Sequence, residues 1–416
     1  MKMIKNNSAV MADTTSDLWE KMNKLTVGEC FFQIRNGANI KQGVADGGFP
    51  ITRIETIAND RFNRDRMGYA GITDADKYQS YILEDGDLLM SHINSVQYLG
   101  RTVLYHKQEN EKIIHGMNLL AMKANRDILN PAYAQYYFRS IPFRAQIRQI
   151  TKKSVNQASF TVSDLKKIPI QVPSLLEQCN AVETLDRVNK LLELHQHQLQ
   201  TLDELVKARF VELFGNPVIN NKGWNVSDLE QLTIKIGSGA TPKGGKEAYQ
   251  TDGISLIRSM NVHNGKFEYK ELAHISDEQA ARLENVAVEE NDVLLNITGA
   301  SVARSCVVPT NVLPARVNQH VCIIRCKDSI MPDFINSLLI DDNYQDLLWS
   351  IAGSGATREA ITKQQVESLQ IILPPISKQE EFSKFINRVD KSKSAVQKSL
   401  DEAQLLFDSL MQQYFE

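Results

Sequence analysis

The sequence has little of what membrane insertion, secretion or a metal site would need. No apolar run approaches the ~20 residues of a membrane-spanning helix. The N-terminal stretch lacks the apolar core of a signal peptide. The five cysteines, at positions 30, 179, 306, 322 and 326, follow no zinc-binding spacing. We therefore expect a cytoplasmic protein without a membrane segment, in which buried thiols account for the Cys322 and Cys326 pair.

Catalytic signatures are absent as well. The chain has no GxxxxGK[ST] phosphate loop, no strand-linked GxGxxG and no GxSxG, which argues against ATP hydrolysis by this chain. One weak resemblance to metal-dependent nucleases remains, in which Asp252 lies upstream of Glu268 and Lys270. Such nucleases need carboxylates and a lysine that converge on one cation. The other half of the chain has no matching acid–x–lysine, so we expect no catalytic residue, metal or cofactor in this chain.

The charge of the chain is nearly balanced but unevenly spread. The formal net charge is −3 over 416 residues, a length that predicts two or three domains. Seven Lys/Arg and one acid lie between Phe138 and Lys167, and six basic residues and three acids lie between Lys235 and Lys270. Four Lys/Arg and seven Asp/Glu lie between Ser174 and Phe214. The near-neutral total therefore conceals basic surfaces beside an acidic segment.

Several stretches occur twice in the same order. The sequence IPIQVPSLLEQ (Ile168–Gln178) overlays LQIILPPISKQ (Leu369–Gln379) at an offset of 201. Three further matches place the first half over the second at offsets of 205, 205 and 200: Arg53 over Arg258, Asp87 over Asp292, and Asn118 over Asn318. Four matches in one order predict an internal duplication, with two equivalent modules of short strands, turns and a few helices.

Two long segments contain neither glycine nor proline. They are Leu175–Phe214 and Ile376–Phe415, and in both the apolar residues recur every three or four positions. This spacing predicts two coiled-coil helices, each roughly 60 Å long at 1.5 Å per residue. If the halves are equivalent, a pseudo-twofold axis makes the two helices antiparallel. The expected domains are a tail with a short helix (1–24), module 1 (25–173), a long helix (174–215), module 2 (216–373) and a second long helix (374–416).

Each module carries one polar loop early in its sequence. In module 2, KIGSGATPKGGKEAYQ brings glycines together with candidate ligand-binding residues, namely Lys235, Ser238, Thr241, Lys243 and Lys246. Backbone N–H groups of such a loop approach phosphates closely, and lysines add charge. The equivalent stretch QIRNGANIKQG supplies Arg35, Asn36, Lys41 and Gln42. Arg, Asn and Gln are the side chains that read guanine and adenine edges in the major groove. The alternative is an ordinary mobile surface loop.

Further candidates for DNA contact follow predicted strands and helices. They are Arg53, Arg144, Arg148, Lys152, Lys153, Arg258, Asn261, Arg304 and Arg358. For Arg53 and Arg258 a structural ion pair is an equal alternative. For the loops that carry Lys152, Lys153, Arg304 and Arg358, turn formation or helix capping is the alternative.

The combination resembles the specificity subunit of type I restriction–modification enzymes. The stretches that carry the resemblance are LTIKIGSGATPKGG, VEENDVLLNITG, RVNQHV, ESLQIILPPISKQEEF and DLKKIPIQVPSLLEQ. It covers the chain from about Leu25 to Phe415, and it implies an α+β fold. Two homologous α/β target recognition domains would be joined by two long antiparallel coiled-coil helices with pseudo-twofold symmetry.

The resemblance also implies a role. Each module would read one half of a bipartite target in double-stranded DNA, and the helices would set the spacer. Neighbouring major-groove faces lie about 34–36 Å apart, within the reach of such helices. The helices would also dock two methyltransferase subunits, which carry S-adenosylmethionine and methylate adenine. Restriction subunits would supply ATP- and magnesium-dependent cleavage, so this chain would be non-catalytic. Two rivals remain open, a nuclease that uses Asp252, Glu268 and Lys270, and a coiled-coil scaffold that binds only proteins.

Overall fold

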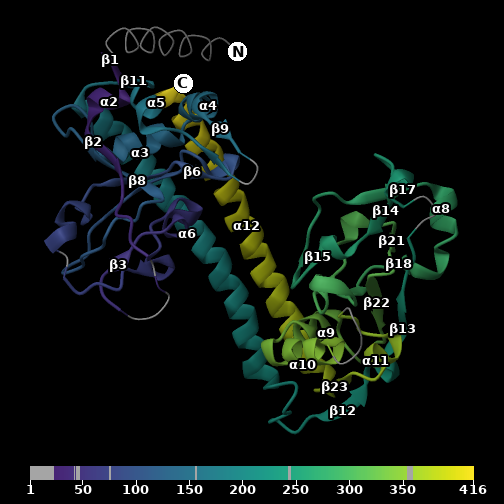
Figure 1. Cartoon of the computed structure of the whole chain (residues 1–416). Coiled ribbons are helices and arrows are strands. Elements are labelled where there is room, and N and C mark those ends of the chain that lie inside the picture. The colour runs from purple at the N-terminus through teal and green to yellow at the C-terminus, as the bar shows by residue number, and fades with distance from the viewer. Residues whose placement is uncertain are drawn as a thin grey trace, which may run out of the picture. The chain divides into compact units, whose positions relative to one another are not determined.

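The computed structural model describes residues 23–41, 43, 47–74, 76–154, 157–241, 245–353 and 359–416, drawn in colour in Figure 1. The predicted tail of residues 1–24 lies almost wholly outside this range. So do three of the candidate residues, Gln42, Lys243 and Arg358. Within the described range no helix is long and apolar enough to span a membrane. Cys322 is buried there and Cys326 is half-buried.

The chain forms two compact units, and each contains one module. Unit 1 comprises Met1–Leu194 and Leu400–Glu416, and unit 2 comprises His195–Ser399. Each unit therefore holds one module together with parts of both long helices. The predicted boundaries at 24, 173, 215 and 373 separate the helices from the modules; they stay predictions.

Unit 1 is built on a four-stranded antiparallel sheet with the order β2-β8-β5-β7. The first strand of the module, β1, pairs with the last, β11. A separate three-stranded sheet has the order β6-β10-β9. The strands are β1 (Asn23–Thr26), β2 (Phe31–Asn36), β3 (Pro50–Ile51), β4 (Gly68–Tyr69), β5 (Leu88–Ser91), β6 (Ile93–Asn94), β7 (Thr102–Leu104), β8 (Leu119–Ala124), β9 (Lys152–Lys153), β10 (Ala158–Ser159) and β11 (Pro169–Val172). The α-helices are α2 (Val27–Cys30), α3 (Pro131–Arg139), α4 (Ile141–Ile150), α5 (Val162–Lys166) and the start of α6 (Leu175–Phe214).

Unit 2 repeats this plan with the sheet order β13-β22-β19-β20, and it adds a second four-stranded sheet with the order β17-β14-β21-β18. Its strands are β12 (Asn225–Asp228), β13 (Thr233–Ser238), β14 (Ile254–Ile257), β15 (Val262–His263), β16 (Lys266–Phe267), β17 (Ala273–Ile275), β18 (Ala287–Val288), β19 (Val293–Asn296), β20 (Ser305–Val307), β21 (Ala315–Val317), β22 (Val321–Cys326) and β23 (Gln370–Leu373). Its α-helices are α7 (Leu229–Leu232), α8 (Asp277–Ala281), α9 (Pro332–Leu339), α10 (Asp342–Gly353), α11 (Lys363–Glu367) and most of α12 (Ile376–Phe415).

The long helices run antiparallel, as predicted. Within unit 2, Asp203 of α6 accepts from Lys393 of α12 at 2.6 Å, and further along α6 Arg209 pairs with Glu381. As the residue numbers on α6 increase, the numbers of their partners on α12 decrease, so the two helices run in opposite directions. Phe210 packs on Phe382 with a ring-centroid distance of 5.7 Å in the same stretch. Both helices have the bounds that the absence of glycine and proline predicted.

Aromatic residues of the long helices close the core of each unit. In unit 1, the ring of Phe415 near the end of α12 lies 5.2 Å from that of Tyr133 on α3. In unit 2, the ring of Phe214 at the end of α6 lies 4.8 Å from that of Phe334 on α9. Burying one such side chain contributes about 1.5–3 kcal/mol. The helix ends are therefore part of the module cores as well as of the helix pair.

The repeated Pro-x-x-x-x-Gln motif has the same contacts in both units. Gln178 donates to the carbonyl of Pro173 at 2.8 Å and accepts from the N–H of Asn130 at 2.7 Å. Gln379 donates to the carbonyl of Pro374 at 2.9 Å and accepts from the Met331 N–H at 2.9 Å, and both glutamines are fully buried. Each glutamine thus joins the last strand, the start of the long helix and the start of α3 or α9. Its loss would leave buried backbone groups unpaired.

A buried aspartate stabilises the same turn in both sheets. Asp87 accepts from the N–H of Glu84 at 2.9 Å, and Asp292 accepts from the N–H of Glu289 at 2.7 Å. A cation on the neighbouring strand faces each carboxylate, Lys123 at 3.5 Å in unit 1 and Arg325 at 2.8 Å in unit 2. This confirms the predicted equivalence of Asp87 and Asp292.

The strand registers correct one predicted match. Strands β5 and β19 pair with β8 and β22 so that Met122 and Ile324 are equivalent, although they are 202 residues apart. Asn118 therefore corresponds to His320, and its predicted match with Asn318 is wrong. The offset is 205 at β5 and β19 and 202 at β8 and β22, so module 2 has three fewer residues between these strands than module 1 has.

Candidate nucleic-acid interface

Loops at one end of each four-stranded sheet bring many of the predicted residues together. In unit 2, β13 and β19 end where β22 begins, because Ser238 pairs with Cys322 and Asn296 with Val321. In unit 1, β2 and β5 end where β8 begins in the same way. We call these loops the loop edge. It comprises residues 36–41, 92–99 and 115–118 in unit 1, and residues 238–241, 297–302 and 317–320 in unit 2.

The polar loop of module 1 lies on its loop edge. Arg35 is half-buried at the end of β2, and its guanidinium stacks over the ring of Tyr81 with 4.2 Å between Cζ and the ring centroid. Asn36 and Lys41 follow and are exposed. Stacking holds the Arg35 side chain in one orientation. These three residues stay predictions as DNA contacts.

Arg53 and Arg258 occupy equivalent places and have backbone partners. Arg53 donates from Nη2 to the carbonyl of Gly43 at 3.0 Å, and Arg258 donates to the carbonyl of Glu271. Each residue also begins a 3₁₀ turn, Ile54–Asp60 after Arg53 and Ser259–Asn261 after Arg258. Both arginines therefore fasten loops together through backbone carbonyls.

Asn261 has a structural role in this arrangement. Its side chain is fully buried, its Oδ1 accepts from the N–H of Arg258 at 3.1 Å, and its Nδ2 donates to the carbonyl of Glu268 at 2.9 Å. The Asn261 side chain has no solvent-accessible surface. The structure therefore does not support the prediction that Asn261 contacts DNA.

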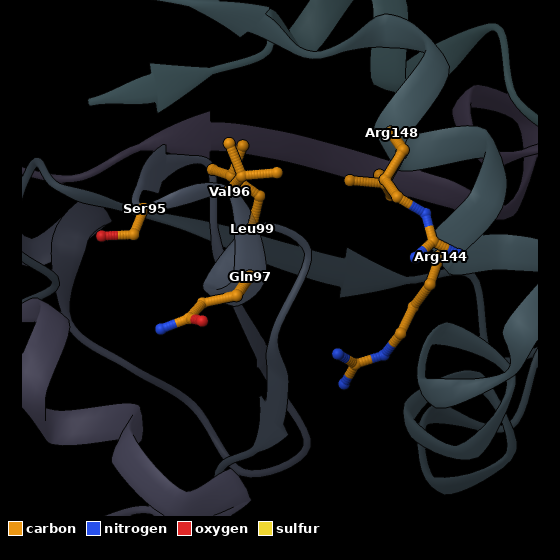
Figure 2. Close-up of a pocket in the computed structure, with 7 residues that line it drawn as sticks. Ser95, Val96, Gln97, Leu99, Arg144 and Arg148 are labelled. Atoms are coloured by element: carbon orange, nitrogen blue, oxygen red, sulfur yellow. The ribbon is translucent and has the colours of Figure 1, made fainter. Parts of the chain in front are cut away.

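A pocket of about 480 Å³ lies beside the loop edge of unit 1 and is lined by two of the predicted arginines. Figure 2 shows Arg144 and Arg148 extending from α4 on one side, with Ser95, Val96, Gln97 and Leu99 on the other. Residues Val96–Tyr98 form a 3₁₀ turn directly after β6. Among the described residues, no carboxylate forms an ion pair with Arg144 or Arg148. Two guanidinium groups beside neutral side chains make this pocket suitable for an anion such as a DNA phosphate.

Two more arginines lie next to this pocket. Arg139 donates from Nη2 to the carbonyl of Asp60 at 2.9 Å, and Arg101 pairs through Nε with the Asp60 carboxylate at 3.1 Å. Burial lowers the pKa of Arg139, Asp60 opposes the shift, and the nearby charges of Arg144 and Arg101 add to it. The arginines therefore repel one another, and a bound anion would relieve that repulsion.

Lys152 and Lys153 continue this basic surface. Both are exposed on β9, which pairs with β10, and β10 in turn pairs with β6 next to the pocket. Five of the seven cations that the sequence showed between Phe138 and Lys167 are gathered here, with Arg101 in addition. Arg101 escaped the sequence analysis because it lies in a different part of the chain.

The equivalent surface of unit 2 has the same backbone and different side chains. The N–H of Arg144 bonds to the carbonyl of Ser140, and the N–H of Gln345 bonds to the carbonyl of Asp341 at the start of α10. Gln345 therefore replaces Arg144, and Trp349, which is 40% exposed, replaces Arg148. The scaffold is repeated, whereas the positive charge is not.

The remaining candidates of module 2 are divided between the loop edge and other places. Ser238 is exposed at the end of β13, and Thr241 donates to Oε1 of Gln319. Lys235 is half-buried and pairs in register with Arg325, away from the loop edge, and burial lowers its pKa. Arg304 lies beside His263, with 3.5 Å between Nη1 and Nδ1. Lys246 falls in the turn Gly245–Ala248, and its side chain lies outside the described range.

One residue of the rival nuclease reading, Glu268, makes a local contact within its own turn. Glu268 uses Oε1 to accept from the backbone N–H of Lys270 at 3.1 Å, which is a local turn contact. Across the described residues there is no group of three or more His, Cys, Asp or Glu side chains placed to hold a metal ion. The geometry thus provides no support for metal-dependent cleavage.

The model of the type I restriction modification DNA specificity domain matches this chain twice, over residues 20–204 and again over residues 221–404. The chain belongs to this family. The two matches confirm the predicted duplication and the predicted family. They also give the modules their function class, because each module is a DNA specificity domain.

Similar proteins cover nearly the whole chain. The protein designated the MjaX specificity subunit of a type I restriction enzyme, from Methanocaldococcus jannaschii, is 26% identical over 372 residues, which are 86% of this chain and 84% of that protein. The type I restriction enzyme StySPI specificity subunit from Salmonella potsdam is 20% identical over 391 residues, 88% of this chain and 81% of that one.

Solved structures share the fold. The S subunit of a type I restriction–modification system from M. genitalium aligns with a TM-score of 0.58 at 12% identity, over 95% of this chain and 96% of its own. A chain from a study of complex assembly and conformational transition in the type I system aligns with a TM-score of 0.55 at 18% identity, over 95% and 98%. The predicted fold class, two modules with two long paired helices, is therefore confirmed.

Proposed function

We propose that this chain reads a bipartite target in double-stranded DNA, one half with each module, for a type I restriction–modification complex. The observation that carries the proposal is the loop edge, which recurs on one scaffold with different side chains in the two modules. Because the scaffold is repeated, each module can present its loop edge to DNA in the same way. Because the side chains differ, the two half-sites can have different sequences.

The long helices would set the spacer between the half-sites. Each is a continuous helix of 40 residues, and parts of both helices belong to the core of each unit. Helices joined to both cores by buried aromatic residues resist bending more than a flexible linker does. A fixed gap in the recognised sequence is the expected consequence.

The partners would include two methyltransferase subunits and restriction subunits. We propose that these hold S-adenosylmethionine, ATP and magnesium, and that this chain is non-catalytic and acts on DNA in the cytoplasm of a bacterium or archaeon. Exposed leucines on the helices support a protein-docking role, since Leu191, Leu194 and Leu205 are each between 46% and 48% exposed. Acidic neighbours such as Glu183, Glu193 and Glu204 would keep DNA away from that surface.

Methylome sequencing of cells with and without this chain tests the proposal. We expect an adenine-methylated motif, split by a fixed gap, that disappears when the chain is removed. Cells that lack the methyltransferase partner are the control, because they should lose the same motif. If both genes are intact and no split motif depends on this chain, the proposed function is wrong.

A further inference from the structure

Three loops of module 2 are joined by a short chain of side-chain hydrogen bonds. Thr241 donates to Oε1 of Gln319, and Nε2 of Gln319 lies 3.1 Å from Nε2 of His320. Nδ1 of His320 in turn contacts Oγ1 of Thr298. The chain therefore runs across the loop edge, from the loop after β13 to the loop after β19.

These contacts fix the orientation of an exposed amide. Gln319 donates one N–H to the unprotonated Nε2 of His320, which places the histidine proton on Nδ1, facing Thr298. Its Oε1 accepts from Thr241. An amide carries two N–H groups and two carbonyl lone pairs. The contacts described here use one of each, so one N–H and one carbonyl lone pair of this exposed side chain take part in none of them.

The backbone beneath Gln319 is held in place as well. Asn318 is 6% exposed; its carbonyl accepts from Gly239 at 3.1 Å, and its Oδ1 accepts from the N–H of His320 at 3.0 Å. A Cβ at Gly239 would lie 1.7 Å from the carbonyl oxygen of Val317, so only glycine permits this close approach. The amide is therefore oriented before any ligand binds, and little entropy is lost on binding.

We propose that Gln319 is a specificity-determining residue of module 2 that binds the major-groove edge of an adenine. A paired donor and acceptor match adenine, whose N7 accepts and whose N6 amino group donates. The remaining N–H of Gln319 would donate to N7, and Oε1 would accept from N6. Thr241 and His320 are positioning residues that hold the amide in this orientation. This inference rests on the proposed function, because it deepens the role of the module 2 loop edge.

Module 1 has no side-chain amide at the position equivalent to Gln319. The register that relates β8 to β22 places Met117, which is 44% exposed, where Gln319 lies in module 2. A thioether neither donates an N–H nor accepts strongly. The adenine contact is therefore assigned to the half-site that module 2 reads.

A two-stage experiment tests this assignment. Methylome sequencing with the unchanged chain first defines the bipartite motif; if no motif depends on the chain, the proposed function itself fails. With Q319A we expect one A·T position in one half of the motif to accept any base pair while the other half stays unchanged. A motif identical to that of the unchanged chain would overturn the inference and leave the proposed function standing.

Binding then tests the contact atom by atom. The purified complex of this chain with its methyltransferase partner is titrated with duplexes in which each adenine of the module 2 half-site is replaced in turn by 7-deazaadenine, which lacks N7. At one position we expect the unchanged complex to bind about 5- to 150-fold more weakly, and Q319A to bind both duplexes equally. T241V should lose part of this discrimination.

Controls separate recognition from folding. Gln231 is exposed near the opposite end of the same sheet, so Q231A should leave motif and discrimination unchanged. If Q319A fails to methylate, the same titration still decides the question. Retained discrimination against 7-deazaadenine overturns the inference, and its loss, with other duplexes bound normally, supports it.

Discussion

The two modules use nearly the same internal contacts and present different surfaces. Gln178 and Gln379 bond to the same backbone groups, and Asp87 and Asp292 anchor the same turn. On α4 and α10, however, a pair of arginines in one module corresponds to a glutamine and a tryptophan in the other. Buried polar groups are constrained by their partners, whereas exposed side chains are free to diverge.

This difference separates two kinds of site within one fold. The contacts that join strands to the long helices must be kept for either unit to fold, because unpaired buried groups are costly. The exposed side chains of the loop edge have no such constraint, so they can change with the DNA sequence that they read. Module 1 offers a cluster of cations, and module 2 offers an oriented amide. We expect module 1 to contribute more of the salt-dependent affinity.

The largest expected effect is on the free energy of unfolding, and it should differ between the two buried aspartates. The Asp292 side chain is fully buried and bonds to Arg325 through two oxygens at 2.8 and 2.9 Å. D292A would leave that guanidinium without its buried partner and should cost about 3–5 kcal/mol of unfolding free energy. D87A should cost less, because Lys123 lies 3.5 Å from the Asp87 carboxylate and makes one contact with it, whereas Arg325 makes two shorter ones with Asp292. Chemical denaturation of each full-length variant measures both values, and equal losses would contradict the account.

The next effect is a loss of stability in acid that arises in unit 1. Burial lowers the pKa of His92 to about 4, and burial likewise lowers that of His115 to about 4. The unfolded chain has a histidine pKa near 6.5, so it binds protons more readily than the folded chain below that pH. Stability is therefore complete above about pH 6.5 and falls as the pH drops toward 4, by roughly 3 kcal/mol for each histidine.

Matched variants take the residue that module 2 has at the same place. Ile297 occupies the position of His92, since the carbonyl of each accepts from the residue just before the N-cap of the last short helix, Phe160 before α5 and Ile361 before α11. H92I should remove part of the acid sensitivity while leaving stability at pH 8 almost unchanged. Thermal unfolding between pH 4 and 8 provides the measurement. A pH profile identical to that of the unchanged chain would show that His92 does not titrate as the structure indicates.

A smaller effect concerns the arginine pocket. R144Q with R148Q copies part of module 2 into module 1 and removes two cations that face an open pocket. We expect the plot of log affinity against log salt to become less steep by about 2 units, with an unchanged recognition motif. Fluorescence anisotropy of the methyltransferase complex at several salt concentrations tests this. The pair Q345A and W349A in module 2 is the control and should leave the slope unaltered.

The smallest effect is expected on the long helices. Glu183 and Glu193 are exposed and form ion pairs with Arg187 and Arg61, and such surface pairs contribute at most about 1 kcal/mol. Changing Glu183, Glu193 and Glu204 to lysine should leave folding intact and weaken binding to the methyltransferase. Size-exclusion chromatography with light scattering would reveal the assembly state. Unchanged assembly would place the docking surface elsewhere.

The fold was predictable where periodicity and repetition reinforced each other. Forty residues without glycine or proline predicted α6 and α12 with their bounds, and the duplicated Pro-x-x-x-x-Gln predicted where each module meets its helix. A single short sequence match between the two modules predicted equivalent residues less well. The pairing of Asn118 with Asn318 was off by two residues, because it was based on two identical residues, whereas the register of β8 and β22 with their neighbouring strands determines which positions are equivalent.

The candidate site was predictable in composition and less so in geometry. Two residues of the dense basic run after Phe138, Arg144 and Arg148, do line one pocket. Asn261 was indistinguishable from a surface asparagine, because its partners are backbone groups brought together only by folding. Gln319 was missed for the same reason, since the threonine and histidine that orient it come from separate loops. Three polar residues directly before a buried strand, Asn318–His320, were the available signal.

A chain with two copies of one module tests the central claim most directly. Residues 25–173 would be replaced by the corresponding residues of module 2, and the methylome of cells that carry this chain would be sequenced. If each module reads its own half-site and the helices run antiparallel, the new motif should contain the module 2 half-site twice, as an inverted repeat across a fixed gap. An assembled, active complex that still methylates the original asymmetric motif would contradict the account.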